Sequence, residues 1–300
     1  MNGVLVVDKP SGPTSHDVVA RLRRAMRFQR IGHTGTLDPI ATGVLPMVVG
    51  RATRLAQFFT AMPKQYLATV LLGRMTDTYD VTGSVERATP SPHLSRADVE
   101  PAIAIFRGTY SQAAPPFSAR KIAGTPGYVL ARRKQRVEPR SRSVTVERLD
   151  LVNIEGERVV LRVRCSAGFY VRSLAHELGQ HLGCGACLEA LRREESGGYG
   201  LQDATALDVL EREGLDGTSR IVSIDRLLTS LPGLVLSTRG SGRAAHGNAL
   251  SPDDLETPAS ALGFGGSASG PVRLLDPGGG LVGLAEVDAV GVLHPRIVLV

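Results

Sequence analysis

Residues 32–46, GHTGTLDPIATGVLP, are the stretch whose composition is best suited to hold a reactive group in place. The segment contains three glycines and two prolines and follows neither helical nor strand periodicity, which indicates a constrained loop. Pro39 biases the preceding Asp38 toward an extended conformation, so the loop should present one carboxylate in a nearly fixed direction. Taken alone, an aspartate before proline is more typical of a turn or cap than of catalysis. The loop therefore makes Asp38 a candidate and leaves its role open.

The rest of the chain lacks the common motifs of cofactor and metal chemistry. The sequence contains no phosphate-binding loop ending in Gly-Lys-Ser/Thr, no nucleophile elbow, no His-Glu-x-x-His and no dinucleotide fingerprint. Cys184 and Cys187 form a single Cys-x-x-Cys, preceded by Cys165, His176 and His181. One such pair is a weak zinc signal, and small packed thiols are the more common outcome. We expect neither a cofactor nor a metal, and the odd number of cysteines predicts no disulfide framework.

The charge of the chain is unevenly distributed. Its formal net charge is +6, but residues 230–300 contain four arginines and six carboxylates, so they carry −2 and residues 1–229 carry +8. Clustered arginine neutralises phosphates, so a basic first part is typical of a protein that binds a polyanion; charge that only maintains solubility is the alternative. Residues 113–142 are rich in proline, glycine and arginine, and we predict an insertion that grips RNA or DNA through Arg132, Arg133 and Arg136.

Hydrophobic periodicity locates the elements that must position these groups. Thr14 or Ser15 should begin a helix that has Asp17 in its first turn and reaches Met26. The predicted strands are residues 4–7, 65–73, 144–152 and 158–165, and a second helix is predicted over residues 170–182, ended by Gly183. Because hairpin-like pairs of strands alternate irregularly with helices, we expect an α+β fold with a mixed, largely antiparallel central sheet flanked by helices and loops.

Composition divides the chain near residue 230. Residues 257–271 have the composition of a loop and precede short apolar strands, which predicts a small all-β module over 230–300 after a domain of residues 1–229. The expected strands of the module are residues 272–275, 281–287 and 291–300. The first apolar run is too short for a signal peptide, and no run approaches the ~18 apolar residues of a membrane span. We therefore expect a cytoplasmic protein without a membrane partner.

Six motifs, ordered along residues 3–200, together carry a resemblance to a known family. They are residues 8–15, DKPSGPTS; residues 32–45; residues 64–66, KQY; residues 116–121, PFSARK; residues 165–172, CSAGFYVR; and residues 191–193, LRR. The set resembles the bacterial TruB family of tRNA pseudouridine synthases, which act on uridine 55 in the T-arm loop. The resemblance implies the pseudouridine synthase fold, and residues 272–296 are similar, less specifically, to a PUA-type RNA-binding module.

The resemblance assigns roles to individual residues. Asp38 matches the family's catalytic aspartate, and Arg172 matches an arginine that pairs with it. Such a partner is needed because burial raises the pKa of a carboxylate and a neighbouring guanidinium lowers it. By the same resemblance, Tyr66 would stack on the flipped uracil and help to remove its C5 proton, while Tyr170 and Leu191 would line the pocket.

The resemblance also implies that the target base is flipped out of the RNA, and it leaves the order of bond changes open. A stacked base must leave its RNA loop before it reacts, and His33 would, by analogy with the family, occupy or support the vacated space. Asp38 could attack C1′ of the sugar, add to C6 of uracil or act through a glycal, and the sequence does not distinguish these routes. We expect tRNA as the substrate and a monomer with no obligatory protein partner. The alternatives are an RNA-binding or tRNA-folding chaperone and a guide-RNA-dependent relative.

Overall fold

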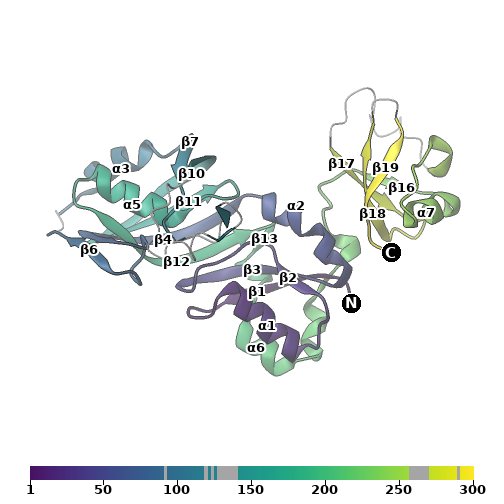
Figure 1. Ribbon diagram of the computed structural model, residues 1–300, viewed down its shortest axis with the longest axis horizontal. Helices are drawn as coiled ribbons and strands as arrows, with labels where there is room; N and C mark the ends of the chain where they lie inside the picture. Colours follow the sequence, from purple (N-terminus) through teal and green to yellow (C-terminus); the bar gives the residue numbers. More distant parts are fainter. Residues whose placement is uncertain (91–92, 118–120, 123–124, 127–140, 257–269, 289–290) are drawn as a thin grey trace.

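The computed structural model describes residues 1–300 apart from residues 91–92, 118–120, 123–124, 127–140, 257–269 and 289–290. Figure 1 shows a larger body built on one long sheet and a smaller module at the C-terminal end, next to α2 (Ala56–Ala61). Arg132, Arg133 and Arg136 lie outside the described residues, as does most of the insertion around them. No helix in the described part of the chain has the length and apolar character that crossing a membrane requires.

The large sheet has eleven strands, of which eight form a continuous path in the order β14-β1-β3-β12-β4-β11-β10-β7. In that order they are β14 (Thr205–Ala206), β1 (Gly3–Lys9), β3 (Ala41–Val49), β12 (Ala186–Ser196), β4 (Lys64–Leu72), β11 (Arg158–Cys165), β10 (Ser141–Glu155) and β7 (Gly108–Ala113). The edge strands β2 (Ile31–His33), β13 (Tyr199–Gly200) and β15 (Val222–Ser223) join β3, β12 and β1. Only the β1–β14 and β3–β12 pairs are parallel, so the predicted mixed, largely antiparallel sheet is confirmed.

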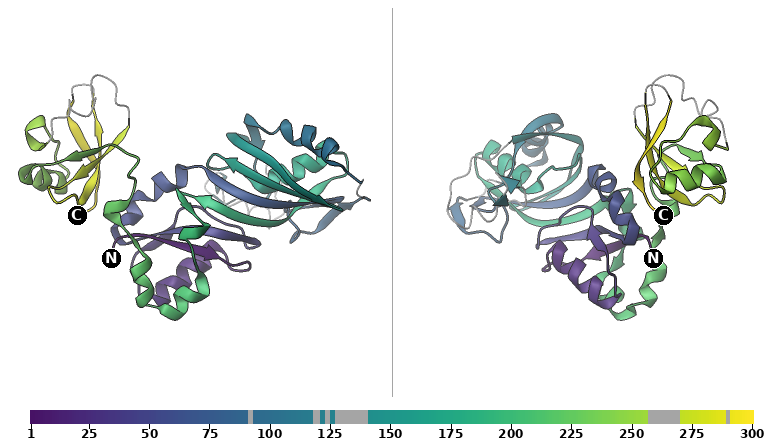
Figure 2. Two further views of the ribbon diagram at one scale, coloured as in Figure 1. Left: turned by 180° about the vertical axis from the view of Figure 1, so that it is seen from behind. Right: turned by 45° about the vertical axis from the view of Figure 1, so that its right-hand side comes forward.

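Helices cover the sheet at two places. Figure 2 shows α1 (Ser15–Ala25) and α6 (Leu207–Glu213) together beside β1 and β3, and α3 (Arg96–Ala104) lies with α5 (Val171–His181) over the other half. The α1 start is the predicted one: Asp17 N donates to Thr14 Oγ1 at 3.1 Å, and Thr14 N donates to the Asp17 carboxylate at 2.8 Å. Gly183, with φ 76°, follows the end of α5 and permits the turn that stops it.

The smaller elements connect these layers. They are η1 (Gly50–Leu55), β5 (Arg74–Thr76), β6 (Val85–Ala88), β8 (Lys121–Ile122), β9 (Thr125–Pro126), η2 (Leu201–Asp203), η3 (Asp216–Arg220) and η4 (Ile224–Arg226). β5 pairs with β6, and β8 pairs with β9, each as a two-stranded antiparallel sheet.

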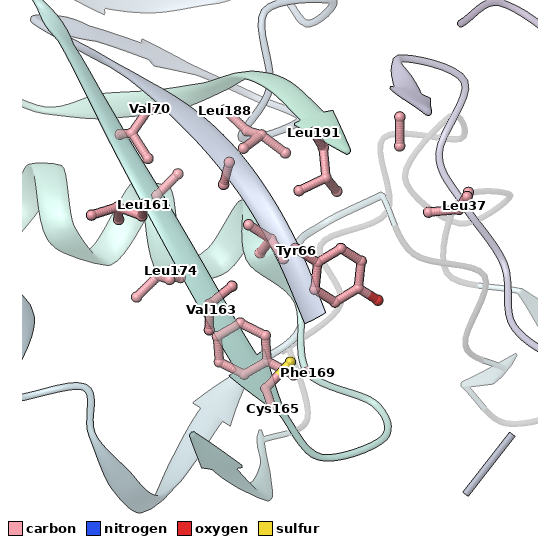
Figure 3. Close-up of a cluster of buried hydrophobic side chains, with 14 of the residues drawn as sticks. Leu37, Tyr66, Val70, Leu161, Val163, Cys165, Phe169, Leu174, Leu188 and Leu191 are labelled. Carbon is pink, nitrogen blue, oxygen red and sulfur yellow. The ribbon is translucent and has the colours of Figure 1, made fainter. Parts of the chain in front are cut away.

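Both faces of the large sheet are buried around β1. Leu5 and Val7 point into the main core beneath α1, whereas Val4 and Val6 point into a second core on the opposite face. Successive side chains of a strand face opposite ways, so a strand buried on both faces reads as the uninterrupted apolar run seen in the sequence. Figure 3 shows the part of the main core where β4, β11, β12 and α5 meet, with Tyr66 at the end nearest Leu37.

The C-terminal module is built on a four-stranded sheet in the order β16 (Gly233–Val235), β17 (Pro271–Leu275), β18 (Leu281–Val287) and β19 (Leu293–Val298). The predicted strands are present, together with α7 (Thr238–Ala245) and η5 (Pro252–Asp254), which the sequence patterns do not predict. The module is therefore not purely β. Leu281, Leu284 and Leu299 belong to the same buried cluster as Val4 and Val6, and Arg51 Nη1 of η1 donates to Leu299 O at 3.1 Å, so the module joins the larger body through this second core.

Candidate active site

A cavity of about 570 Å³ opens where the Asp38 loop, α2, β4, the start of α5 and β12 meet. Five residues singled out in the sequence line it: Asp38, Tyr66, Tyr170, Arg172 and Leu191. They come from positions up to 153 residues apart in the chain, so the fold rather than local sequence brings them together. His33 is not among the lining residues.

The Asp38 carboxylate is held by Arg172 in a two-pronged ion pair. Arg172 Nε donates to Asp38 Oδ2 at 2.9 Å and Nη2 donates to Oδ1 at 3.2 Å. The Arg172 side chain is 7% exposed, whereas Asp38 remains 34% exposed toward the cavity. Ion pairs with two parallel N–H···O bonds fix direction as well as charge. The arrangement holds one carboxylate in a fixed direction while leaving it open to a bound molecule.

Three further contacts fix the Arg172 guanidinium. Nη1 donates to the main-chain oxygen of Thr78 at 2.9 Å, and Nη2 donates to that of Phe117 at 2.9 Å. A second carboxylate, Asp80 Oδ2, lies 3.8 Å from Nη1 and is buried. Because α5 begins at Val171, this cation sits at a helix N-terminus, where the dipole favours an anion such as Asp38. Asp80 and the Thr78 carbonyl are site features that the sequence patterns did not indicate.

Two buried cations, Lys9 and Arg193, hold the loop that carries Asp38 by donating to its main-chain oxygens. Lys9 Nζ donates to the main-chain oxygens of Ala41 at 2.7 Å, Pro39 at 3.3 Å and Pro10 at 2.9 Å. Burial lowers the pKa of Lys9 to about 8, and the nearby Asp38 charge acts in the opposite direction. Lys9 ties residues 39–41, which follow Asp38 in the loop, to the end of β1, and no carboxylate of the described residues contacts its ammonium.

Arg193 is the second buried cation and is only 1% exposed. Its Nε donates to the main-chain oxygen of Val44 at 2.7 Å, and Nη2 and Nη1 donate to those of Gly35 at 3.1 Å and Thr36 at 3.4 Å. Gly43, with φ 102°, runs so close to β12 that an added Cβ would lie 2.2 Å from the Arg193 main-chain oxygen. Only glycine fits there, which explains one of the three glycines of the loop.

Tyr66 lies on β4 at the floor of the cavity and is 8% exposed. Burial raises the pKa of its phenol, and the Arg193 guanidinium opposes that rise through its charge and a hydrogen bond. Lys64, two residues earlier, also lines the cavity, and its ammonium donates to the main-chain oxygens of Thr60 and of Met62. Burial, and then the charge of Arg193, lower the pKa of Lys64 to about 8. The floor therefore combines an aromatic ring with cations that have no carboxylate partner among the described residues.

Of the remaining residues singled out in the sequence, Tyr170 and Leu191 line the cavity and His33 does not. The main chain of Tyr170 is clamped by Gln112, which accepts from Tyr170 N at 2.9 Å and donates to Tyr170 O at 3.1 Å. Leu191 lies on β12 opposite Ala41 of β3 and presents an apolar wall. His33 ends β2, where its Nδ1 accepts from Gly35 N at 3.3 Å; burial, and then the charges of Arg193 and His16, lower its pKa. His33 thus contacts the Asp38 loop rather than the cavity.

The cysteines are packed, as the sequence indicates. Cys165, Cys184 and Cys187 are free and buried. Burial raises the pKa of the Cys165 thiol to about 12 and that of Cys187 to about 11, so neither is a ready metal ligand or nucleophile. Across the described ranges, no group of three or more His, Cys, Asp or Glu side chains is arranged to hold a metal ion.

Comparison with known proteins assigns the chain to a family. Residues 23–171 match the model of the N-terminal domain of TruB family pseudouridylate synthases, and residues 172–231 match that of the tRNA pseudouridylate synthase B C-terminal domain. The chain is 40% identical to tRNA pseudouridine synthase B of Solibacter usitatus over the full length of both proteins, and 42% identical to that of Geobacter sulfurreducens over 93% of this chain and 91% of the relative. The chain belongs to the TruB family.

Solved structures of the same fold extend this result. An archaeal box H/ACA Nop10–Cbf5 complex matches 99% of this chain and 86% of its counterpart at a TM-score of 0.74 and 24% identity. A Cbf5–Nop10–Gar1 complex matches 99% and 85% at the same TM-score and 25% identity. The expected pseudouridine synthase fold is therefore confirmed. The cavity around Asp38 is the candidate active site of this TruB family member.

Proposed function

We propose that this protein converts uridine 55 in the T-arm loop of tRNA to pseudouridine, with Asp38 as the catalytic carboxylate. The observation that carries the proposal is the two-pronged Asp38–Arg172 pair at the mouth of a cavity floored by Tyr66. The relatives at 40% and 42% identity are named tRNA pseudouridine synthase B, which supports tRNA as the substrate.

The chemistry requires a fixed anion in a place from which water can be excluded. Pseudouridine formation breaks the N-glycosidic bond, turns the uracil and joins its C5 to the sugar, so the base supplies its own carbon nucleophile. Attack on C1′, addition to C6 and a glycal route all begin with an ionised carboxylate. Arg172 pairs with Asp38 and fixes its direction, and the one-third exposure of Asp38 leaves it accessible to a nucleotide.

An everted nucleotide fits the cavity. A volume of about 570 Å³ is within the range of small-molecule sites, roughly 300–1,000 Å³. Tyr66 and Leu191 offer apolar surface to the uracil, and Tyr170 lies at the rim beside Arg172. Extruding the base costs a few kcal/mol, and His33, through its contact with the loop at Gly35, is proposed to support the RNA where the base has left.

Tyr66 is proposed to stack on the uracil and to assist removal of the C5 proton. Burial raises the pKa of its phenol, so the neutral form dominates before substrate binds. Arg193 is beside the phenol and stabilises the phenolate that proton transfer would require. In this step the phenol first gives its own proton to solvent, and the phenolate then takes the C5 proton and returns to the neutral form.

The two proposed domains and the arginine-rich insertion are each assigned a role in binding the tRNA. We propose a catalytic domain of residues 1–229 and a PUA-like RNA-binding domain of residues 230–300. Arg132, Arg133 and Arg136, which lie outside the described residues, are proposed to contact phosphates of the T arm. The protein is proposed to act in the cytoplasm as a monomer without an obligatory protein partner, although the solved structures named above contain Cbf5 in complexes with Nop10 or with Nop10 and Gar1.

Mass-spectrometric mapping of pseudouridine in an unmodified tRNA transcript tests the proposal. The purified chain alone should convert position 55 and no other uridine. Conversion that required a guide RNA or added proteins would favour the guide-dependent relative, and tight binding without any pseudouridine would favour an RNA chaperone. A transcript with cytidine at position 55 is the matched control and should remain unmodified.

A further inference from the structure

A pair of stacked rings lies behind the active site and has no part in the chemistry described so far. Tyr79 and His176 have ring centroids 3.7 Å apart and planes inclined by only 10°. His176 is on α5, one turn after Arg172, so the two side chains share a helix face. Tyr79 is in the loop between β5 and β6, directly between Thr78 and Asp80. The two elements thus touch twice, once through Arg172 and once through the rings.

The loop holds Arg172 through groups on both sides of Tyr79. The Thr78 main-chain oxygen accepts from Arg172 Nη1 at 2.9 Å, and Asp80 Oδ2 lies 3.8 Å from the same nitrogen. Asp80 is fixed in turn, because its Oδ1 accepts from Thr78 Oγ1 at 2.9 Å and from Thr82 N at 3.0 Å. A shift of this loop would therefore move two of the groups that orient the guanidinium facing Asp38.

Tyr79 adopts a backbone conformation that its side chain does not favour. Its φ is 65°, in the left-handed region where glycine and asparagine are the usual residues. Its carbonyl accepts from Leu188 N of β12 at 2.9 Å, which locks the turn to the sheet. A bulky aromatic residue at such a position is maintained only when surrounding contacts compensate for the strain. The stack on His176 is one such contact, beside the main-chain hydrogen bonds that Tyr79 makes with Thr76 and Leu188.

The surroundings of His176 also indicate that its ring contact with Tyr79 matters more than simple filling of space. It is 8% exposed, and its Nε2 is 2.9 Å from Gln180 Nε2, but its Nδ1 is buried with no hydrogen-bond partner in the described part of the chain. Burying an unpaired polar atom is unfavourable, so packing alone would favour an apolar side chain at this position. What the imidazole adds is a flat face against Tyr79.

We propose that Tyr79 and His176 are positioning residues, whose stack clamps the 77–82 loop to α5 and so sets the orientation of Arg172 toward Asp38. This inference rests on the proposed function only for its assay. The rings touch neither the cavity nor the reacting atoms, since neither Tyr79 nor His176 lines it. Their effect should therefore appear in the rate of the chemical step rather than in tRNA binding.

The test compares two substitutions of Tyr79 in a tRNA pseudouridine assay. Tyr79→Asn suits the left-handed backbone but loses the ring, and we expect kcat to fall about tenfold, equivalent to about 1.4 kcal/mol, with KM changed less than twofold. Tyr79→Phe keeps the ring and should restore kcat to within twofold of the wild type. Tyr199→Asn, which removes the ring that stacks on Phe59 in the second core, is the matched control and should leave kcat unchanged.

A double variant separates positioning from general destabilisation. If the stack acts through Arg172, Tyr79→Asn should cost less than twofold in kcat when introduced into Arg172→Lys. An equal tenfold loss in both backgrounds, or an unchanged kcat in Tyr79→Asn, would overturn the proposal. Thermal unfolding of each variant identifies misfolded protein, in which case His176→Leu replaces Tyr79→Asn with the same expectation. Absence of wild-type turnover would instead refute the proposed function itself.

Discussion

Two arginine–carboxylate pairs in this protein have the same hydrogen-bond geometry and different surroundings. Arg172 meets Asp38, and Arg162 meets Glu194, in both cases through Nε at 2.9 Å and Nη2 at 3.2 Å. Arg172 is 7% exposed and also donates to two main-chain oxygens, whereas Arg162 is 42% exposed and lies on the open face of β11. Distances alone therefore do not distinguish a candidate catalytic pair from a surface one. The burial of Arg172 and its additional main-chain partners do.

The comparison extends to the cations below the Asp38 loop. Lys9 and Arg193 are buried and donate to main-chain oxygens, so their charges are not paired directly with a carboxylate of the described residues, and the charge of Lys9 interacts with that of Asp38. Arg158, which is 53% exposed, pairs instead with Glu189 on the sheet surface. Exposed pairs contribute little to stability, because solvent screens them. We infer that the buried cations shape the loop and the potential at Asp38, while the exposed ones are available for other partners.

Replacing the arginine of each pair should give the largest difference between the two sites, which is measured as the loss of unfolding free energy. Arg172→Gln should lower the free energy of unfolding by roughly 3–5 kcal/mol, because it leaves a partly buried carboxylate and two carbonyls without their donor. Arg162→Gln should change it by less than about 1 kcal/mol. Urea denaturation of both variants measures the difference. Equal losses of unfolding free energy in the two variants would show that the surroundings of an ion pair do not determine its contribution to stability.

Substitutions at the same two arginines should also differ in their effect on kcat. Arg172→Lys keeps the charge but loses the two-pronged geometry, and kcat should fall by roughly 10²-fold. Arg162→Lys should leave kcat within twofold of the wild type. Single-turnover rates on a tRNA transcript provide the measurement, and an unimpaired Arg172→Lys protein would contradict the orienting role given to the guanidinium.

Arginines contribute to RNA binding where they meet a phosphate rather than a carboxylate. Replacing Arg132, Arg133 and Arg136 together with alanine should weaken tRNA binding and reduce the salt slope by about one unit for each phosphate that the variant no longer neutralises. Arg212→Ala, a 74% exposed arginine on α6, is the control and should leave the slope unchanged. Binding isotherms at several salt concentrations make the comparison. An unchanged slope in the triple variant would remove the 113–142 insertion from the RNA interface.

The buried cations predict a smaller effect that depends on pH. Burial lowers the pKa of Lys9 from 10.5 to about 8, so between these values the unfolded chain binds one more proton than the folded protein. The contribution of Lys9 to stability therefore rises with pH across that window and is least favourable below pH 8. Lys9→Met should show a smaller increase in unfolding free energy from pH 8 to pH 10 than the wild type. Parallel pH dependences would indicate that Lys9 is not desolvated in the folded state.

Local structure could be predicted wherever the decisive residues are neighbours in sequence. The Thr14–Asp17 capping box, the hairpin of β10 and β11 and the stop of α5 at Gly183 all follow from patterns of a few residues. Helix α7 could not be predicted, since its sequence TRGSGRAA has two glycines and a weak helical preference. It is stabilised by Ser237 at its N-cap and by Asp254, which meets Arg239 at 3.1 Å and Arg243 at 3.3 Å.

The candidate site was predictable only in part. The proline and glycines around Asp38 mark its loop, and the family resemblance pairs Asp38 with Arg172. The supporting cations are different, because Arg193 reaches Val44 and Gly35 across 149 and 158 residues and Lys9 reaches Ala41 across 32. Nothing local distinguishes such side chains from solvated ones. Lys9 is flanked by Asp8 and Pro10, and Arg193 by Arg192 and Glu194, so neither stands out in the sequence as a lone charge in an apolar strand.

The central claim is that the Asp38 carboxylate performs the chemistry, and replacing it with its neutral isostere tests that claim most directly. Asp38→Asn should bind tRNA with wild-type affinity and form no pseudouridine at position 55, a loss of at least about 10³-fold in rate. Glu194→Gln, the matched change in the pair with Arg162, should retain turnover. Pseudouridine formed by Asp38→Asn at a rate near that of the wild type would contradict the account.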